Sequence, residues 1–163
     1  MTIKMDASET KIGGPTPWQK LVGIICTECT RERFEAFENK ALRFFQENKE
    51  ACMQPRAGMF GDTLLLVAIY KGMQKMALEI IRNDIDGFQR KQTNEQGHTP
   101  LMAACLCEMK GVAMHLLDLG GEECRALHVN KHEESARQFA HVFGLKKVET
   151  RIKEYMKTQR TEL

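Results

Sequence analysis

Small and large apolar residues recur along this chain at a spacing of 36 residues, and no gaps are needed to align them. Alanine coincides at Ala68, Ala104 and Ala140. Large apolar residues coincide in the same register at Met76, Val112 and Val148, at Ile80, Leu116 and Ile152, and at Leu65 and Leu101. A fixed period of this length is typical of a protein built from stacked structural repeats.

Each period predicts two helices joined by a short turn. Thr63, Thr99 and Ser135 stand where a hydroxyl side chain can cap the first helix. Pro100 directly follows Thr99, at the start of a helix, where the missing N–H has no helical partner. The second helix of this unit is expected to end at Gly120, where glycine supplies a C-terminal break.

The period continues only weakly toward the N-terminus. The segment Thr16-Pro17-Trp18-Gln19 has the pattern of a capping box with proline at the first helical position, which predicts a helix. A second helix is expected over 31–48, because apolar residues there recur at helical spacing. Residues 16–57 are therefore predicted to form a divergent N-terminal helical cap, preceded by a flexible lead-in over 1–15.

The segment Gly97-His98-Thr99-Pro100-Leu101, with Ala103 and Ala104 after it, resembles the motif of the ankyrin family. That family's unit is about 33 residues, a β-turn finger followed by two antiparallel helices, so a spacing of 36 implies about three extra residues in the connection. The resemblance implies an all-α ankyrin-repeat solenoid of stacked helix-turn-helix units with short β-turn fingers. Its repeats would span 58–93, 94–129 and 130–157, in one structural domain over 16–157 with a C-terminal tail.

The ankyrin resemblance also implies binding rather than catalysis. Proteins of that family grip other proteins through a concave side, made of finger tips and the exposed positions of each first helix. No cofactor is expected for such a protein. Mapped onto this chain, the expected partner-binding residues are Met59, Phe60, Asp62, Tyr70, Lys71, Glu95, Gln96, His98, Leu106, Cys107, Lys131, His132, Glu134, Val142 and Phe143.

Phe60, Tyr70, Leu106, Val142 and Phe143 would make this expected surface unusually apolar. A large exposed apolar patch usually marks an interaction site, and aromatic side chains make good anchors. The alternative is that some of these side chains belong to the core, above all Val142 and Phe143 packed against the C-terminal helix. The sequence leaves both interpretations open.

Composition narrows the class of partner. Hydrophobic residues make up 42% of the 163 residues, enough for the core of one domain. The chain has 24 Lys and Arg against 22 Asp and Glu, so its net charge creates no strong electrostatic field. Neither nucleic acid nor a membrane is therefore an expected partner. The six cysteines are interpreted as reduced thiols in an intracellular compartment, and the cytoplasm is the expected location.

Cysteine and histidine residues give a second hypothesis, a zinc- or thiol-dependent enzyme or a metal-binding protein. Cys124, His128 and His132 have spacings of four, and Cys26 and Cys29 form a CxxC pair, so ordinary zinc ligands are present. The three residues from Cys124 onward fall, however, where the repeat pattern places a finger rather than a helix. No base with an orienting group can be placed beside any thiol, and we favour a non-catalytic protein.

Residues 61–72, GDTLLLVAIYKG, also resemble repeats of the inhibitor-of-kappa-B group. That resemblance implies a short viral-type inhibitor, which would block a transcription factor of the NF-kappa-B type in the cytoplasm, with access to the nucleus. The phosphorylation-triggered degradation motif of the group is missing, because Ser8 stands alone in the lead-in. Regulated turnover by that route is therefore not expected.

Overall fold

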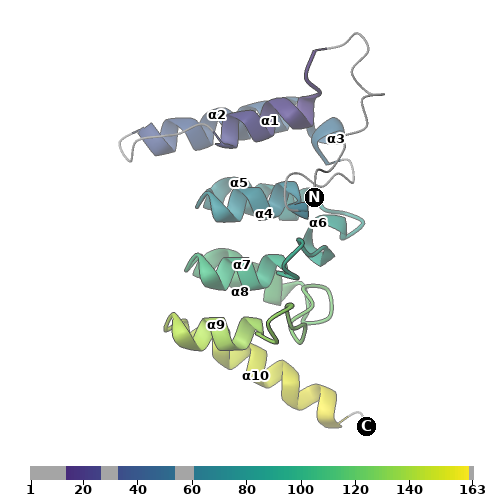
Figure 1. The fold of residues 1–163 in the computed structure, drawn as a ribbon, viewed down its shortest axis with the longest axis vertical. Coiled ribbons are helices and arrows are strands. Elements are labelled where there is room, and N and C mark those ends of the chain that lie inside the picture. Colours follow the sequence, from purple (N-terminus) through teal and green to yellow (C-terminus); the bar gives the residue numbers. More distant parts are fainter. Residues whose placement is uncertain (1–13, 27–32, 54–60, 162–163) are drawn as a thin grey trace, which may run out of the picture.

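A computed structural model describes residues 14–26, 33–53 and 61–161 of this chain (Figure 1). These ranges are mostly helical and contain no strand, apart from one isolated β-bridge between Val129 and Ser135, so the all-α prediction is confirmed. The helices are α1 Pro17–Cys26, α2 Phe34–Glu47, α3 Lys49–Cys52, α4 Leu64–Tyr70, α5 Gln74–Asn83, α6 Phe88–Lys91, α7 Pro100–Leu106, α8 Lys110–Asp118, α9 Ala136–Val142 and α10 Lys146–Thr161.

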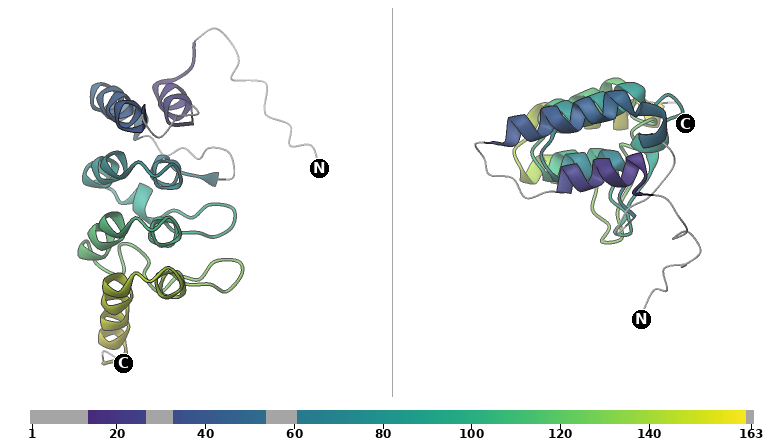
Figure 2. Two further views of the ribbon diagram at one scale, coloured as in Figure 1. Left: turned by 90° about the vertical axis from the view of Figure 1, so that its left-hand side faces the viewer. Right: turned by 90° about the horizontal axis from the view of Figure 1, so that it is seen from above.

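The helices form antiparallel pairs stacked into layers (Figure 1). One column contains α1, α4, α7 and α9, and the other contains α2, α5, α8 and α10 (Figure 2). Each helix packs against its partner and against the helices above and below it in its own column. Loops between the pairs project beside the first column (Figure 2). This arrangement places repeated positions of the sequence above one another along the stack.

Hydroxyl side chains begin the first helices of the periodic units, as predicted. Thr63 Oγ1 accepts a hydrogen bond from Leu66 N, and Thr99 Oγ1 accepts one from Met102 N. Ser135 forms a full capping box with Gln138 at the start of α9. Because each of these side chains satisfies a free N–H of the first turn, the start of each helix is fixed locally.

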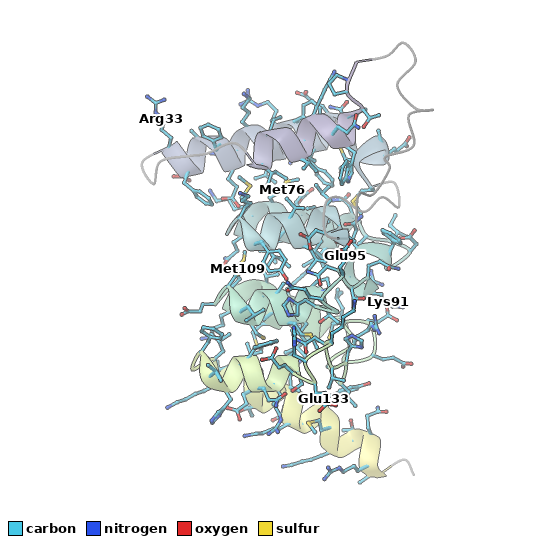
Figure 3. The ribbon with its side chains drawn as sticks, in the orientation of Figure 1. Arg33, Met76, Lys91, Glu95, Met109 and Glu133 are labelled. Atoms are coloured by element: carbon cyan, nitrogen blue, oxygen red, sulfur yellow. The ribbon has the colours of Figure 1, made fainter. Side chains whose placement is uncertain are left out.

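Small and large apolar residues fill the space between layers as the period predicts. Ala68, Ala104 and Ala140 are fully buried, where the first-column helices pack on one another. Alanine lets these helices approach closely, and a larger side chain would overpack the contact. Met76 and Met109 lie between successive layers (Figure 3). One continuous apolar core therefore runs through the stack.

The layer formed by α1 and α2 is joined to the rest by a buried carboxylate. Glu38 Oε1 accepts hydrogen bonds from Lys75 N at 2.6 Å and from Met76 N at 3.2 Å. These N–H groups lie in the first turn of α5, where Met73 at the N-cap offers no capping side chain. Glu38 thus caps a helix of the next layer, and its negative charge suits that helix end.

A short helix lies in the connection between the first two periodic units. Helix α6 lies in the connection after α5 and contacts α4, α5 and α7. Its buried Gln89 accepts a hydrogen bond from Leu65 N of α4 through Oε1 at 3.1 Å. At the other end of the chain, α10 continues to Thr161, about one helical turn beyond residue 157, where the last repeat was expected to end.

Two positions of the period have a left-handed backbone in every unit. They are Gly72, Glu108 and Gly144 after the first helices, and Gly61, Gly97 and Glu133 in the loops before them, with φ between 55° and 83°. Glycine adopts this conformation without a Cβ clash, whereas other L-residues are strained in it. Glu108 and Glu133 therefore carry backbone strain that the glycines of the other units avoid.

Replacing the two glutamates by glycine tests this interpretation. We expect Glu108→Gly and Glu133→Gly each to raise the free energy of unfolding by about 0.5–1 kcal/mol, because strain relief outweighs the extra chain entropy. The reverse change, Gly144→Ala, should destabilise by about 1 kcal/mol, although a Cβ there meets nothing within 4 Å. Urea unfolding measures all three variants. If the glycine and alanine substitutions changed the free energy of unfolding in the same direction, the assignment of backbone strain to Glu108 and Glu133 would be contradicted.

Candidate functional site

A pocket of about 420 Å³ lies beside the first column of helices, where three successive units meet. It is lined by Asp62, Tyr70, Asn94, Glu95, Gln96, His98 and Lys131. Six of these seven residues are among the expected partner-binding residues, and the structure brings them together from three successive units. Asn94 is the one lining residue that the sequence did not indicate.

Asn94 organises both the pocket and the loop that contains it. Its Oδ1 accepts hydrogen bonds from the N–H groups of Gln96 and His98, and its Nδ2 donates to Asp62 Oδ1 at 3.1 Å. Asn130, 36 residues later, accepts in the same way from the second and fourth residues after it. The spacing of the two asparagines, which favour such turns, was the signal that could have identified them.

His98 is the point where three units touch. Its Nδ1 lies 3.0 Å from Tyr70 Oη, and the two atoms share a hydrogen bond. Its ring also meets the ring of Phe139 in α9 edge to face, with centroids 6.0 Å apart. A loop of one unit is thereby held between the first helices of the units on either side.

The pocket disfavours charge on the groups that line it. Burial raises the pKa of Asp62, and the hydrogen bond from Asn94 only partly opposes this. Burial, with the Asp62 carboxylate nearby, raises the pKa of Tyr70 to about 12. Burial lowers the pKa of His98, although Glu134 acts in the opposite direction. Tyr70 is therefore a neutral hydrogen-bonding group at physiological pH rather than an acid or base.

The two loops beside the pocket are held close together. Lys131 N donates a hydrogen bond to Gln96 O at 3.0 Å. A Cβ on Gly97 would lie 3.2 Å from Asn130 Cα, so this glycine allows the close approach as well as the positive φ. Glu95 and Glu133, in successive loops, lie one above the other along the stack (Figure 3).

An apolar series continues from the pocket along the first-column helices. Tyr70 is 37% exposed, Val142 is 73% exposed and Phe143 is 38% exposed. The alternative that Val142 belongs to the core is therefore wrong, because most of its side chain is exposed, and Phe143 is partly exposed as well. Leu106 and Cys107, the equivalent residues of α7, are half-buried against the core.

The remaining expected binding residues lie outside the pocket lining. Lys71 and His132 are exposed, and Glu134 is half-buried. Glu134 Oε2 accepts a hydrogen bond from Asn130 Nδ2, so it also stabilises its own loop. Met59 and Phe60 lie outside the residues that the structure describes.

Cys124, His128 and His132 do not converge on a metal site. Cys124 is buried, and its thiol lies 3.6 Å from Gly121 O. His128 accepts from Arg125 through Nδ1, so Nε2 carries the proton and donates to Gly97 O at 3.2 Å. Within the described ranges no group of three His, Cys, Asp or Glu residues could hold a metal ion.

The thiols of the described residues are also poor nucleophiles. Burial raises the pKa of Cys52 to about 11 and of Cys105 and Cys124 to about 12. Burial raises the pKa of Cys107 as well. These thiols are therefore protonated at physiological pH, whereas nucleophilic attack needs the thiolate. Cys29 and the side chain of Cys26, the predicted CxxC pair, lie outside what the structure describes.

A buried carboxylate organises the connection that leads to the pocket loop. Asp84 accepts from Gln89 N and Arg90 N, both at 2.9 Å. Burial raises the pKa of Asp84, and this effect outweighs the two hydrogen bonds and the nearby guanidinium of Arg90, which lower it. Arg90 in turn pairs with Glu123 of the next unit at 2.8 Å, and Lys91 pairs with the same carboxylate at 2.9 Å.

Further hydrogen bonds carry this network to the pocket loop. Arg125 donates to Lys91 O at 3.0 Å and to His128 Nδ1 at 2.9 Å. His128 then donates to Gly97 O, between the pocket residues Gln96 and His98. The connections after α5 and α8 are thus linked by hydrogen bonds to the loop that lines the pocket.

Comparisons of this chain with protein-family models, with curated proteins and with solved structures gave no match in any of the three. None of the helices in the described ranges combines the length and the apolar character needed to cross a membrane. The pocket and the adjoining apolar series are therefore the features that bear on the function.

Proposed function

We propose that this chain is an ankyrin-type repeat protein that binds a partner protein without catalysis, and thereby blocks or tethers it. Three features support the ankyrin assignment: the 36-residue period, the threonine and serine caps, and the loops that project beside the first helices. A stack of this kind offers a continuous surface along its repeats, which suits the capture of another macromolecule.

The observation that carries the proposal is the continuity of the pocket with the apolar series. Tyr70 belongs to the pocket and to the apolar series, since its hydroxyl shares a hydrogen bond with His98 and its side chain is partly exposed. Val142 and Phe143 extend the exposed apolar surface two units further. An apolar strip beside a polar, hydrogen-bonded pocket has the composition of a binding hot spot with its rim.

A triple variant, Tyr70→Ala, Leu106→Glu and Phe143→Ala, tests the proposed surface. Affinity capture from a source-cell lysate, followed by quantitative mass spectrometry, should recover specific partners with the wild type. The variant should lose them on the order of 100-fold, because it removes two aromatic anchors and places a charge between them.

The matched control changes three exposed apolar residues that do not line the pocket, Ile85→Ala, Leu119→Glu and Leu127→Ala. Circular dichroism and urea unfolding verify that both variants retain the fold. Retention of every specific partner by the folded triple variant would refute the proposed surface. Equal loss in the control would also refute it.

The narrower proposal, a blocker of an NF-kappa-B-type transcription factor, is supported by the resemblance of residues 61–72 to inhibitor-of-kappa-B repeats. A purified dimer of that type, bound to its DNA, gives a direct measurement. The wild-type protein should displace the DNA and the triple variant should not. Failure of the wild type to bind the dimer would reject this partner while leaving the general binding proposal to the capture experiment.

A further inference from the structure

Positive charge is concentrated on the last helix of the stack. Residues 146–161 carry six Lys and Arg against two Glu, a net +4, while the other residues carry 18 against 20, a net −2. In the second column, α10 packs on α8, and no described helix lies beyond it (Figure 2). The small net charge of the whole chain therefore conceals a strongly basic end.

Several of these cations have no acidic partner among the described residues. Arg151 pairs with Asp118 at 2.8 Å, and Lys153 pairs with Glu149 at 2.6 Å. The exposed side chains of Lys146, Lys147, Lys157 and Arg160 take part in no ion pair within the described ranges. Lys146 and Lys147 lie in the first turn of α10, where a cation opposes the helix dipole, so local helix stability does not explain them.

A groove runs along α10 beside these lysines. One hollow, of about 340 Å³, is lined by Met114 of α8 and by Lys146, Lys147, Thr150, Arg151 and Glu154. A second, of about 280 Å³, shares Arg151 and Glu154 and continues over Leu117, Gly120, Gly121, Tyr155 and Thr158. The two hollows together extend from Lys146 to Thr158, which is about 18 Å along the helix.

The groove therefore combines an apolar floor with a basic rim at one end. From this we propose that it binds an elongated segment of a partner protein, with acidic side chains at Lys146 and Lys147 and apolar side chains over Met114 and Leu117. Opposite charges at the rim would set the register of the segment, and apolar burial on the floor would supply affinity. This site lies on the second column, apart from the pocket and apolar series proposed above.

A protein segment fits this groove better than nucleic acid does. Binding of single strands relies on exposed aromatic rings on which bases stack. The one aromatic residue of the groove, Tyr155, is half-buried and packs over Gly121, where a Cβ would lie 2.4 Å from its ring. Asp118 and Glu154 beside Arg151 would also repel a phosphate backbone, whereas they leave the lysine end free for carboxylates.

Synthetic peptides of about 12 residues, the length of the groove as a helix, provide the test. The probe is a fluorescent peptide with glutamates in its first half and leucines in its second. One comparison peptide replaces the leucines by serine, another replaces the glutamates by lysine, and a single-stranded DNA of equal charge is the competitor. Fluorescence anisotropy at low and physiological ionic strength measures binding to the full chain.

The probe should bind at least about tenfold more tightly than either comparison peptide, because each lacks one of the two contributions. Lys146→Glu with Lys147→Glu should weaken it at least about tenfold. The control, Lys20→Glu with Lys40→Glu at the opposite end of the stack, should change it less than about twofold. NMR titration of the wild type should shift the amides of residues 114–117 and 146–158.

Three results would overturn the inference. One is equal affinity of the wild type and the Lys146 and Lys147 variant for the probe. Another is displacement of the probe by DNA at equal concentration, which would identify a nucleic-acid surface instead. The third is a set of NMR shifts confined to the loops at 94–98 and 130–134, which would place acidic segments on the pocket already described.

Discussion

Leu116→Ala should lower the free energy of unfolding by about 2–5 kcal/mol, a large part of the total for a domain of this size. Leu116 is fully buried in α8, which packs on α5 in the layer before it and on α10 in the layer after it. Truncation would leave a cavity inside this buried part of the stack. Since units of a stack are stabilised mainly by their neighbours, a cavity in a central layer weakens the coupling of the two halves.

Leu119→Ala is the matched control for this change. Leu119 follows α8 directly, has the same side chain and is 41% exposed. Its truncation should cost less than about 1 kcal/mol, because most of the removed surface is already in contact with water. Urea unfolding followed by circular dichroism measures both. Similar losses for the two leucines would mean that the core does not run through α8.

The parts of this fold that could be predicted are those fixed by local chemistry repeated at one spacing. Thr63, Thr99 and Ser135 cap helices through their own first turns, so their role is independent of the rest of the chain. Ala104 and Leu116 could be assigned to the core because small and large residues keep their register through the period. Periodicity therefore predicted the two helices of each periodic unit and the burial of the aligned apolar residues, whereas the short helices α3 and α6 were not predicted.

What periodicity could not predict depends on contacts between units. Asn94 lies in a polar loop, and only the folded structure places its amide between Asp62 and Tyr70. Glu108 and Glu133 depart from the glycine pattern, so their left-handed backbone is hidden in the sequence. The groove along α10 could not be predicted either, because part of its lining, Met114, comes from α8, and only the folded stack brings the two helices together.

Asp84→Ala should lower the free energy of unfolding by about 3 kcal/mol and loosen the pocket as well. The variant would leave the buried N–H of Gln89 and the part-buried N–H of Arg90 without their acceptor, and the Arg90 guanidinium would keep the backbone carbonyl of residue 84 and Glu123 as partners. Asp86→Ala is the matched control. Asp86 accepts a single exposed hydrogen bond from Phe88 N, so its loss should cost about 1 kcal/mol or less.

Hydrogen exchange in the pocket loop shows whether the hydrogen bonds of Asp84 stabilise the pocket or only the turn around α6. The bonds from Asp84 reach Gly97 through Arg90, Lys91 and the next unit, and Gly97 lies in the loop that Asn94 holds. Amide hydrogen exchange at Gln96 and His98 should therefore accelerate in Asp84→Ala and stay near the wild-type rate in Asp86→Ala. If exchange rises only around residues 84–91, the connection stabilises α6 alone. The pocket would then be held by Asn94 and the neighbouring loop, and its geometry would be independent of the buried carboxylate behind it.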